Sequence, residues 1–297
     1  MRYFVIRTEN LTKSYGHRRG IEDLTLEVEP GEVYGVLGPE HSGKSTLFHL
    51  LLDFIRPSSG RAFVMGMDSH DQANTIRNKV GFIPNNINLN SRRSGLEILR
   101  QMGVSSNGME WQTVRDLSDE LALDLERPVA ALSDNEQWKL CMVQAFMNKP
   151  DLLLLDEPTP ELDVDAQDVL YRLIGEARSE GQTVFFSSSS LCEMERICDR
   201  VAVLHQGRLV AVERGMQLRS RALRKIEMRF AEPIKRDAFT KIPNVKNVHV
   251  DNNKLRCTLQ GDLDGLIKAA SEFHVTDIIS QQPSLKEAYK LYYKIDD

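Results

Sequence analysis

The chain has 297 residues, of which 41% are hydrophobic and 27% are charged. This composition is typical of a globular protein, and it excludes a collagen, a mucin-like stalk and a mostly disordered chain. No apolar run approaches the roughly 18 residues needed to cross a bilayer, so we expect no membrane-spanning segment. The N-terminal residues lack the apolar core and cleavage site of a secretory signal, so we expect no such signal.

The net charge of −5 is divided unevenly along the chain. Residues 216–297 carry 15 basic and 11 acidic side chains, whereas residues 1–215 carry 23 and 32. This shift predicts two domains, 1–215 and 216–297, although an accidental difference in surface composition explains the same numbers. The positive excess of the second part is too small to indicate nucleic-acid binding. The four cysteines form no Cys-x-x-Cys pair, which indicates reduced thiols in a cytosolic protein.

Short apolar strands alternate with helical patterns along most of the first 215 residues. The expected elements, in chain order, are a strand at 33–37, a helix from 43 to about 53, a strand at 151–156, a helix at 162–178, a strand at 183–186 and a hairpin of 201–204 with 208–212. Strands that alternate with helices favour an α/β fold whose largely parallel sheet is covered by helices.

Two parts of the chain depart from this alternation. A mainly helical insertion is expected from about residue 86 to 150, with helices near 96–102 and 111–123. After residue 215 the pattern predicts a small α+β domain. Its expected strands are 225–230, 245–250 and 255–259, and its expected helices are 263–271 and 285–293.

The first expected strand is followed by a motif for phosphate binding. The nine residues match G-x-x-x-x-G-K-[ST] and lie between a strand and a helix, as the motif requires: Gly38, Pro39, Glu40, His41, Ser42, Gly43, Lys44, Ser45 and Thr46. Backbone N–H groups of such a loop face an anion. We predict that Lys44 reaches the β- and γ-phosphates of a nucleotide and that the Ser45 hydroxyl binds Mg²⁺.

Two carboxylates follow the expected strand that ends near residue 155. Asp156 is predicted to hold Mg²⁺, directly or through water, and Glu157 to polarise an attacking water as general base. An acidic helix cap after a core strand gives the same local pattern. Together with the phosphate loop, however, the pair indicates a site for a nucleotide and Mg²⁺.

Residues 3 to about 215 resemble the ATP-binding subunit of an ABC transporter. The motifs that carry the resemblance are Tyr15 ahead of the first strands, the phosphate loop, residues 81–85, Leu132-Ser133 at the start of a helix, residues 152–159, Leu162-Asp163 and residues 198–208. Residues 216–297 resemble the extension on ABC-2 exporters, which include drug exporters. The resemblance implies a P-loop NTPase fold of the ABC ATPase type, with a helical insertion and a small C-terminal α+β domain.

The resemblance also implies ATP with Mg²⁺ as the bound nucleotide. Tyr15 would stack on adenine, although an exposed loop tyrosine is the alternative for that residue. Family members dimerise so that each ATP lies between the phosphate loop of one subunit and the signature segment, here 132–136, of the other. They drive separate membrane-spanning subunits from the cytoplasmic, inner face of the cell membrane, and no nucleic-acid partner is expected.

The signature segment departs from the family pattern Leu-Ser-Gly-Gly-Gln. This chain has Asp134, Asn135 and Glu136 in place of the two glycines and the glutamine. Glycine lets backbone N–H groups approach the γ-phosphate closely, whereas two carboxylates repel it. Ser133 and the start of the following helix remain as favourable groups.

Other departures fall on the expected catalytic groups. Ser189 aligns with the family's switch histidine and cannot carry a positive charge. Asn85 replaces the glutamine of the Gln segment and is one methylene shorter. Glu40 and His41 stand where a neutral residue and a glycine are usual. His41 either opposes the charge of Glu40 or strains a backbone that requires positive φ.

These observations predict a subunit that binds Mg-ATP but turns it over slowly, or only with a partner ATPase whose motifs are intact. The alternative from another class is an ATP-binding, hydrolysis-deficient regulatory or structural subunit of a heterodimer. A soluble ABC protein acting on ribosomes or DNA is a third hypothesis. The single ATPase domain disfavours action on ribosomes, because such family members usually carry two, and the short insertion disfavours DNA repair, because those members carry a very long coiled coil. Homodimer and heterodimer, the transported substrate and the direction of transport stay open at this level.

Overall fold

The computed structural model describes residues 3–16, 18–103, 111–215 and 223–281. The chain divides into two compact units, Met1–Glu213 and Arg214–Asp297. The expected helix at 285–293 lies outside the described residues. Within the described ranges, no helix combines the length and the apolar composition that crossing a membrane requires.

A six-stranded sheet forms the centre of the first unit, in the order β10-β9-β3-β8-β7-β6. Its strands are β3 (Val33–Leu37), β6 (Val80–Ile83), β7 (Leu152–Asp156), β8 (Thr183–Ser188), β9 (Arg200–His205) and β10 (Arg208–Arg214). The pairs β3–β8, β3–β9, β6–β7 and β7–β8 are all parallel. Every residue of β3 and β7 is buried, because a parallel sheet has helices or a second sheet on both faces. The predicted α/β class is therefore confirmed.

A second, antiparallel sheet in this unit has the order β2-β1-β4-β5. Its strands are β1 (Ile6–Tyr15), β2 (Arg18–Val28), β4 (Ser59–Val64) and β5 (Met67–Asp68). The expectation that Tyr15 precedes the first strands is wrong, because Tyr15 is the last residue of β1. Register shifts between β1 and β2 interrupt the two-residue alternation that marks a strand in sequence.

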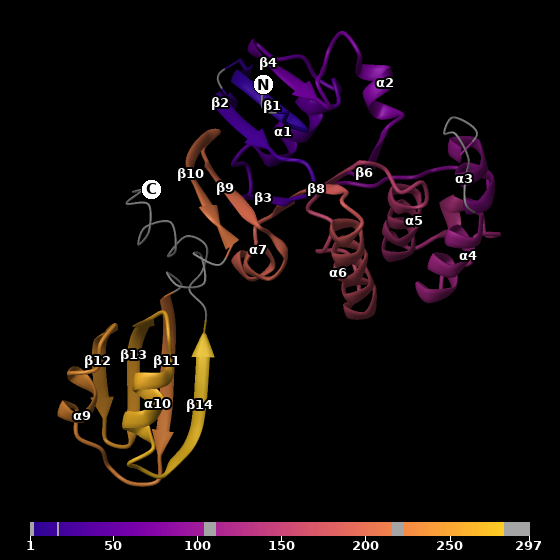
Figure 1. The fold of residues 1–297 in the computed structure, drawn as a ribbon. Helices are drawn as coiled ribbons and strands as arrows, with labels where there is room; N and C mark the ends of the chain where they lie inside the picture. Colours follow the sequence, from indigo (N-terminus) through magenta and orange to yellow (C-terminus); the bar gives the residue numbers. More distant parts are fainter. Residues whose placement is uncertain (1–2, 17, 104–110, 216–222, 282–297) are drawn as a thin grey trace. The chain divides into compact units, whose positions relative to one another are not determined.

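Helices cover both faces of the central sheet (Figure 1). Helix α1 (Lys44–Leu51) contacts β7 of the central sheet as well as β2 and β4 of the antiparallel sheet. It buries Phe48 against Phe185 of β8, with ring centroids 5.1 Å apart. Three other helices contact the central sheet. Helix α5 (Asp134–Phe146) contacts β6, α6 (Val164–Ser179) contacts β8, and α7 (Leu191–Ile197) contacts β3.

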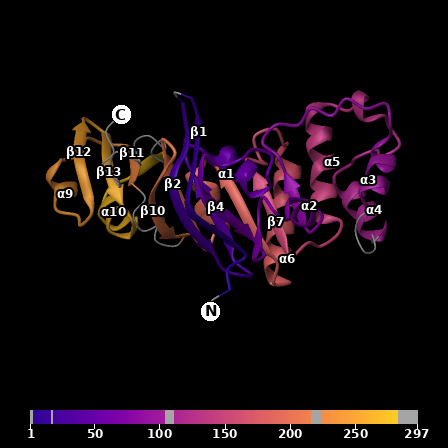
Figure 2. The same cartoon turned by 90° about the horizontal axis from the view of Figure 1, so that it is seen from above.

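Between β6 and β7 the described residues form helices and no strand. The helices are α3 (Gly95–Gly103), α4 (Trp111–Glu120), the 3₁₀ turn Val129–Ala131 and α5. Figure 2 shows α3, α4 and α5 grouped at the end of the unit opposite β1 and β2. The remaining short helix, α2 (Ala73–Arg77), packs beside β6.

The second unit has the β-α-β-β-α-β order of the ferredoxin-like fold. Its elements are β11 (Leu223–Phe230), α9 (Asp237–Thr240), β12 (Val245–Asp251), β13 (Lys254–Gln260), α10 (Asp264–Ala270) and β14 (Val275–Gln281). The sheet order is β12-β13-β11-β14, and every neighbouring pair is antiparallel. The strand β14 and the one-turn helix α9 were not expected from the sequence.

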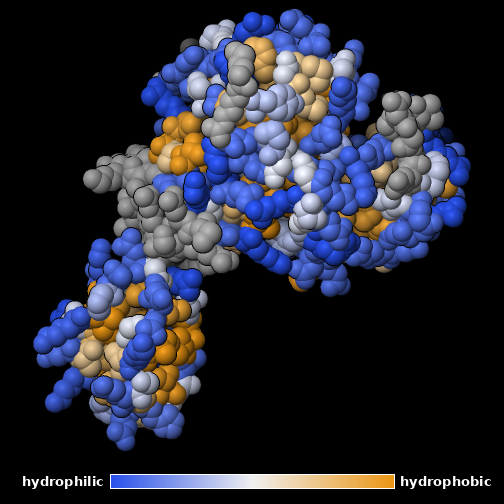
Figure 3. Space-filling view, in the orientation of Figure 1, coloured by the Kyte–Doolittle hydropathy of each residue, from blue (hydrophilic) through white to orange (hydrophobic). Residues whose placement is uncertain are grey.

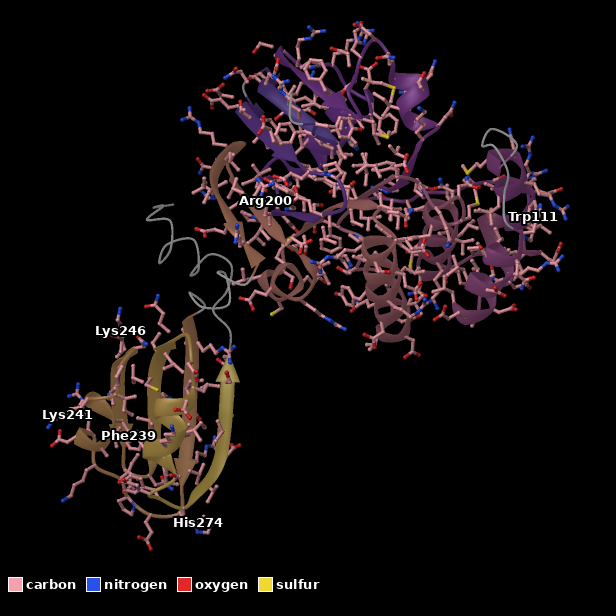
Figure 4. All side chains as sticks on the ribbon, in the orientation of Figure 1. Trp111, Arg200, Phe239, Lys241, Lys246 and His274 are labelled. Atoms are coloured by element: carbon pink, nitrogen blue, oxygen red, sulfur yellow. The ribbon has the colours of Figure 1, made fainter. Side chains whose placement is uncertain are left out.

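Aromatic rings fill the core of the second unit. Phe230, Phe239 and Phe273 lie with each pair of ring centroids 5.8 Å apart. Figure 4 labels Phe239 beside the sheet, whereas Lys241 and Lys246 lie at the β12 side of the unit. In Figure 3 hydrophobic side chains gather over β11 and β14 on the visible face.

Candidate functional site

The phosphate-loop motif joins β3 to α1 at the carboxyl end of the parallel sheet. Gly43 has φ of 105°, and a Cβ there would lie 2.4 Å from the carbonyl oxygen of Gly20, so only glycine fits. His41 also has a left-handed backbone, with φ of 62°. His41 therefore adopts the positive φ that the motif requires at this position, a conformation that is uncommon for a residue with a Cβ.

The Lys44 side chain is held by three oxygens at the centre of the loop. Its Nζ donates to the carbonyl oxygens of Gly38 at 2.6 Å and Pro39 at 2.8 Å. It also lies 3.0 Å from Glu157 Oε1, and Lys44 is only 4% exposed. The structure thus brings the predicted phosphate-binding cation and the predicted general base into direct contact.

Asp156 ends β7 beside this ion pair. Its Oδ1 accepts a hydrogen bond from Ser187 Oγ at 2.6 Å, while its Oδ2 is buried and has no hydrogen-bond partner of ordinary length among the described residues. Burial raises the pKa of Asp156, and hydroxyls of Ser187 and Ser45 oppose that shift. An unpartnered, buried carboxylate oxygen near a serine hydroxyl is the donor set that suits a hard cation such as Mg²⁺.

Asn85 reaches the phosphate loop despite its short side chain. Its Nδ2 donates to Ser45 Oγ at 2.7 Å from the loop that follows β6. The residue therefore contacts Ser45, and its loop follows β6, the strand that pairs with β7, which ends in Asp156. The lost methylene does not remove this amide from the site.

Sequence reasoning missed the part played by Ser187. This residue, at the end of β8, accepts a hydrogen bond from Glu157 N on its Oγ at 3.0 Å and donates that Oγ to Asp156. One buried hydroxyl thus binds the carboxylate of Asp156 and the backbone N–H of Glu157. The signal in the sequence was the Ser187–Ser190 run directly after an apolar strand.

An open groove of about 1080 Å³ surrounds these groups. Its lining residues are Tyr15, Gly20, Glu40, His41, Gly43, Lys44, Ser45, Thr46, Asn85, Trp138, Glu157, Pro160 and Glu161. Four of these lining residues were not predicted as site residues: Gly20, Trp138, Pro160 and Glu161. Gly38, Pro39 and Ser42 belong to the loop beneath the groove, and Asp156 is buried under it.

An aromatic ring and three carboxylates border the groove. The Tyr15 side chain is 47% exposed, and Lys13 Nζ lies 5.3 Å from its ring centroid. The carboxylates come from Glu40, Glu157 and Glu161. The groove thus offers the aromatic face of Tyr15 and the cation of Lys44. Its carboxylates also repel an anionic ligand.

The other two predicted residues do not line this groove. Ser189 is exposed just after β8, while its neighbour Ser188 donates to Glu193 Oε2. Ser133 is the N-cap of α5 and contacts Glu136. Within one chain the structure therefore gathers the phosphate loop, Asn85, Asp156 and Glu157, and leaves the two serines outside.

Known proteins resemble this chain in sequence and in fold. A family model described as ABC transporter matches residues 21–160. The Nod factor export ATP-binding protein I of Cupriavidus metallidurans is 32% identical over 212 residues, which are 70% of each chain. The protein of the same name from Rhizobium meliloti is 30% identical over 84% of this chain and 76% of its own, so that match extends past Glu213. The daunorubicin/doxorubicin resistance ATP-binding protein DrrA of Streptomyces peucetius is 31% identical over 72% of this chain and 67% of its own.

Solved structures share the fold of the first unit. An ATP-binding subunit of an ABC transporter superposes with a TM-score of 0.66 at 27% identity, over 71% of this chain and 90% of that one. A dimeric ATP-binding cassette bound to ADP and phosphate shares the fold, with a TM-score of 0.64 over 70% of this chain and 98% of its own. The fold and the phosphate loop define the class as the P-loop NTPase fold of the ABC type. The chain belongs to the ABC transporter family, as an ATP-binding subunit.

Proposed function

We propose that this chain binds Mg-ATP in the groove and couples binding, with slow hydrolysis, to export by separate membrane-spanning subunits. The observation that carries the proposal is the contact of Lys44 with Glu157, beside Ser45, Asn85 and Asp156. The names of two relatives refer to export and to drug resistance, and they support export as the direction of transport.

In the proposed cycle, phosphate replaces Glu157 as the partner of Lys44. The γ-phosphate draws Lys44 Nζ away from the carbonyl oxygens of Gly38 and Pro39 and from Glu157. The freed carboxylate of Glu157 then accepts a proton from the attacking water. The water oxygen bonds to the γ-phosphorus as the bond from that phosphorus to the β-phosphate oxygen breaks, which gives ADP and phosphate. Lys44 therefore keeps the base occupied until phosphate arrives.

The residues around Asp156 fit a bound Mg²⁺. Two oxygens would hold the ion, Ser45 Oγ and the unpartnered Asp156 Oδ2. Asn85 would act on it only indirectly, through its hydrogen bond to Ser45. The ion would neutralise charge on the β- and γ-phosphates. Ser187 holds the Asp156 side chain in place for this role.

Turnover is slow in this proposal for two reasons. Ser189 supplies no positive charge at the position of the switch histidine, and losing such a group costs about 10²–10⁴-fold in rate. The carboxylates of Glu40 and Glu161 also face the polyphosphate across the groove. The retained Lys44, Ser45, Asp156 and Glu157 support ATP binding all the same.

The proposed assembly contains two ATPase subunits and membrane-spanning partners. In it, the start of α5 of one subunit faces the nucleotide held by the phosphate loop of the other, at the inner face of the cell membrane. The second candidate function is a hydrolysis-deficient regulatory or structural subunit of a heterodimer. The altered residues at positions 134–136 and 189 favour it.

Two measurements on the purified full chain test the proposal. Titration with a fluorescent ATP analogue, with and without Mg²⁺, reports binding, and steady-state phosphate release reports turnover. We expect Mg²⁺-dependent binding with slow release. Absence of binding overturns the proposal, whereas binding without any release above a Glu157→Gln control supports the regulatory subunit instead.

A further inference from the structure

Near the end of strand β1, a lysine contacts a tyrosine. Lys13 Nζ lies over the Tyr15 ring, 5.3 Å from the ring centroid. A cation this close to the face of an aromatic ring is attracted by the negative charge of that face. Among the described residues Lys13 has no ion-pair partner, so no carboxylate there competes with the ring for its charge.

Lys13 is held in this position by a second contact. Its Nζ donates a hydrogen bond of 2.6 Å to the carbonyl oxygen of Arg56, in the segment between α1 and β4. Two further hydrogen bonds join that segment to the end of β1. Ser14 N donates to Ser58 Oγ at 3.1 Å, and Ser58 N donates to the carbonyl oxygen of Thr12 at 2.7 Å. These contacts limit the rotamer freedom that a lysine side chain usually has.

Gly20 and Thr46 adjoin the same tyrosine ring from the groove. A Cβ added to Gly20 would lie only 2.8 Å from Tyr15 Cε2 and 3.1 Å from Thr46 Cγ2, so both side chains lie against the bare backbone of Gly20. Among the described residues, Tyr15, Gly20 and Thr46 line the groove and Lys13 does not. Lys13 thus supports the ring without entering the groove.

The place of Tyr15 suits the base of a nucleotide. Thr46 directly follows Lys44 and Ser45 in the phosphate loop, so the ring borders the space next to the phosphates. Adenine presents a flat π face, which an exposed aromatic ring can stack against. A freely rotating ring would lose conformational freedom on stacking, and this loss would weaken binding. A ring that is oriented in advance avoids that loss.

We propose that Lys13 is a positioning residue for the nucleotide base: its ammonium group fixes the Tyr15 ring in the orientation that stacks on adenine. The inference rests on the proposed function, in which Mg-ATP occupies the groove. In this role Lys13 acts through Tyr15 and needs no contact with phosphate. Its bond to Arg56 also attaches this support to the segment that follows α1, the helix that begins at Lys44.

The test compares two ligands of the purified full chain by isothermal titration. Mg-ATP carries the base, whereas Mg-tripolyphosphate carries the same phosphate chain without base or ribose. Lys13→Met removes the charge and nearly keeps the length of the side chain, and Lys13→Arg keeps a cation that can reach the ring. The matched control is Lys79→Met, at an exposed lysine that is not among the described residues lining the groove.

Lys13→Met should weaken ATP binding about three- to fivefold, the usual worth of a cation–π contact at a partly exposed site. It should leave tripolyphosphate binding within about twofold of the native value, as should Lys79→Met for both ligands. Lys13→Arg should restore most of the ATP affinity, because a guanidinium group also binds over an aromatic ring. Tyr15→Ala should weaken ATP binding about 5- to 100-fold, the range for loss of stacking on one base. Adding Lys13→Met to Tyr15→Ala should cause no further loss.

The double variant gives a result that a general structural role would not produce. Equal losses for ATP and tripolyphosphate in Lys13→Met, or a full second loss in the Tyr15→Ala background, overturn the inference and leave ATP binding in the groove standing. The same holds for unchanged ATP affinity in Lys13→Met or Tyr15→Ala, and for Lys13→Arg binding ATP no better than Lys13→Met. If the native chain binds neither ligand, the proposed function is overturned, and the inference with it.

Discussion

Lys44 Nζ lies 3.0 Å from Glu157 Oε1, so the cation of the phosphate loop neutralises the carboxylate placed to act as base. The Lys44 side chain is almost fully enclosed, while the Glu157 side chain is 22% exposed at the groove. In the proposed function, an arriving phosphate competes for Lys44 and releases Glu157. The proposal therefore links nucleotide binding to activation of the base through this contact.

Replacing Lys44 with alanine should weaken ATP binding about 10- to 100-fold. The lost group makes charge-assisted hydrogen bonds to phosphate, and each is worth roughly 1.5–3 kcal/mol. Titration with a fluorescent ATP analogue measures the effect. The exposed Lys79, which lies outside the groove, provides the control as Lys79→Ala. Equal affinity of Lys44→Ala and the native chain would contradict this role.

Glu157→Gln should lower phosphate release by about 10²-fold or more, because the amide cannot take a proton from water. The same change should leave ATP binding intact or slightly tighter, since one carboxylate facing the phosphates is removed. Phosphate release and nucleotide titration on one preparation give both quantities. A release rate equal to that of the native chain would show that another group acts as base.

His41 adopts φ of 62°, which predicts different costs for different replacements. His41→Val should lower the free energy of unfolding by about 1–2 kcal/mol, because a β-branched side chain is strained at positive φ. His41→Gly should leave it nearly unchanged, since relief of strain offsets the greater chain entropy of glycine. Thermal unfolding of both variants measures the difference, and similar midpoints for the two would be against this assignment.

Ser189→His should raise phosphate release about tenfold or more, because it restores a side chain that can carry positive charge at the expected switch position. Ser189 is exposed, so the larger ring has room. Ser271→His, an exposed serine of the second unit, serves as the control. An unchanged rate in Ser189→His would mean that the slow step lies elsewhere.

The capping box that Ser133 and Glu136 form at the start of α5 should contribute stability that depends on pH. The pKa of Glu136 is lowered from 4.5, chiefly by the hydrogen bond from Ser133 N. The native state therefore binds fewer protons than the unfolded chain as pH falls through that range. The stabilisation is fully present above pH 4.5 and is lost as pH falls through the folded pKa.

Glu136→Ala consequently should lower the free energy of unfolding by about 1 kcal/mol at pH 7, the usual worth of a helix cap. The difference from the native chain should shrink below pH 4.5. Denaturant titrations at several pH values, with Asp134→Ala beside them, measure it. A difference that stays constant down to the lowest pH would argue against the charge of Glu136 as its source.

The sequence predicted the elements whose pattern is local and uninterrupted. The apolar runs of β3 and β7 identified buried strands, and the motif between β3 and α1 located Lys44 and Ser45. The antiparallel sheet of β1, β2, β4 and β5 was missed because register shifts break the alternation. The strand β14 was missed because nearly all of its residues are exposed.

Contacts between segments far apart in the sequence could not be predicted from local sequence patterns. The Asn85–Ser45 hydrogen bond and the two bonds of Ser187 join separate strand ends. The capping box at the start of α5 is a partial exception, because Ser133-x-x-Glu136 is a capping-box pattern readable in the sequence. The pairing of Arg127 with Glu136, nine residues away, depends on the turn between α4 and α5.

The most direct test of this account is isothermal titration of ATP, with Mg²⁺, into the purified chain, followed by phosphate release from the same preparation. The account predicts saturable, Mg²⁺-dependent binding. It also predicts turnover below about 0.1 s⁻¹, since a loss of 10²-fold or more acts on an ordinary rate near 10 s⁻¹. Absent binding, or turnover at the ordinary rate by the chain alone, would contradict it.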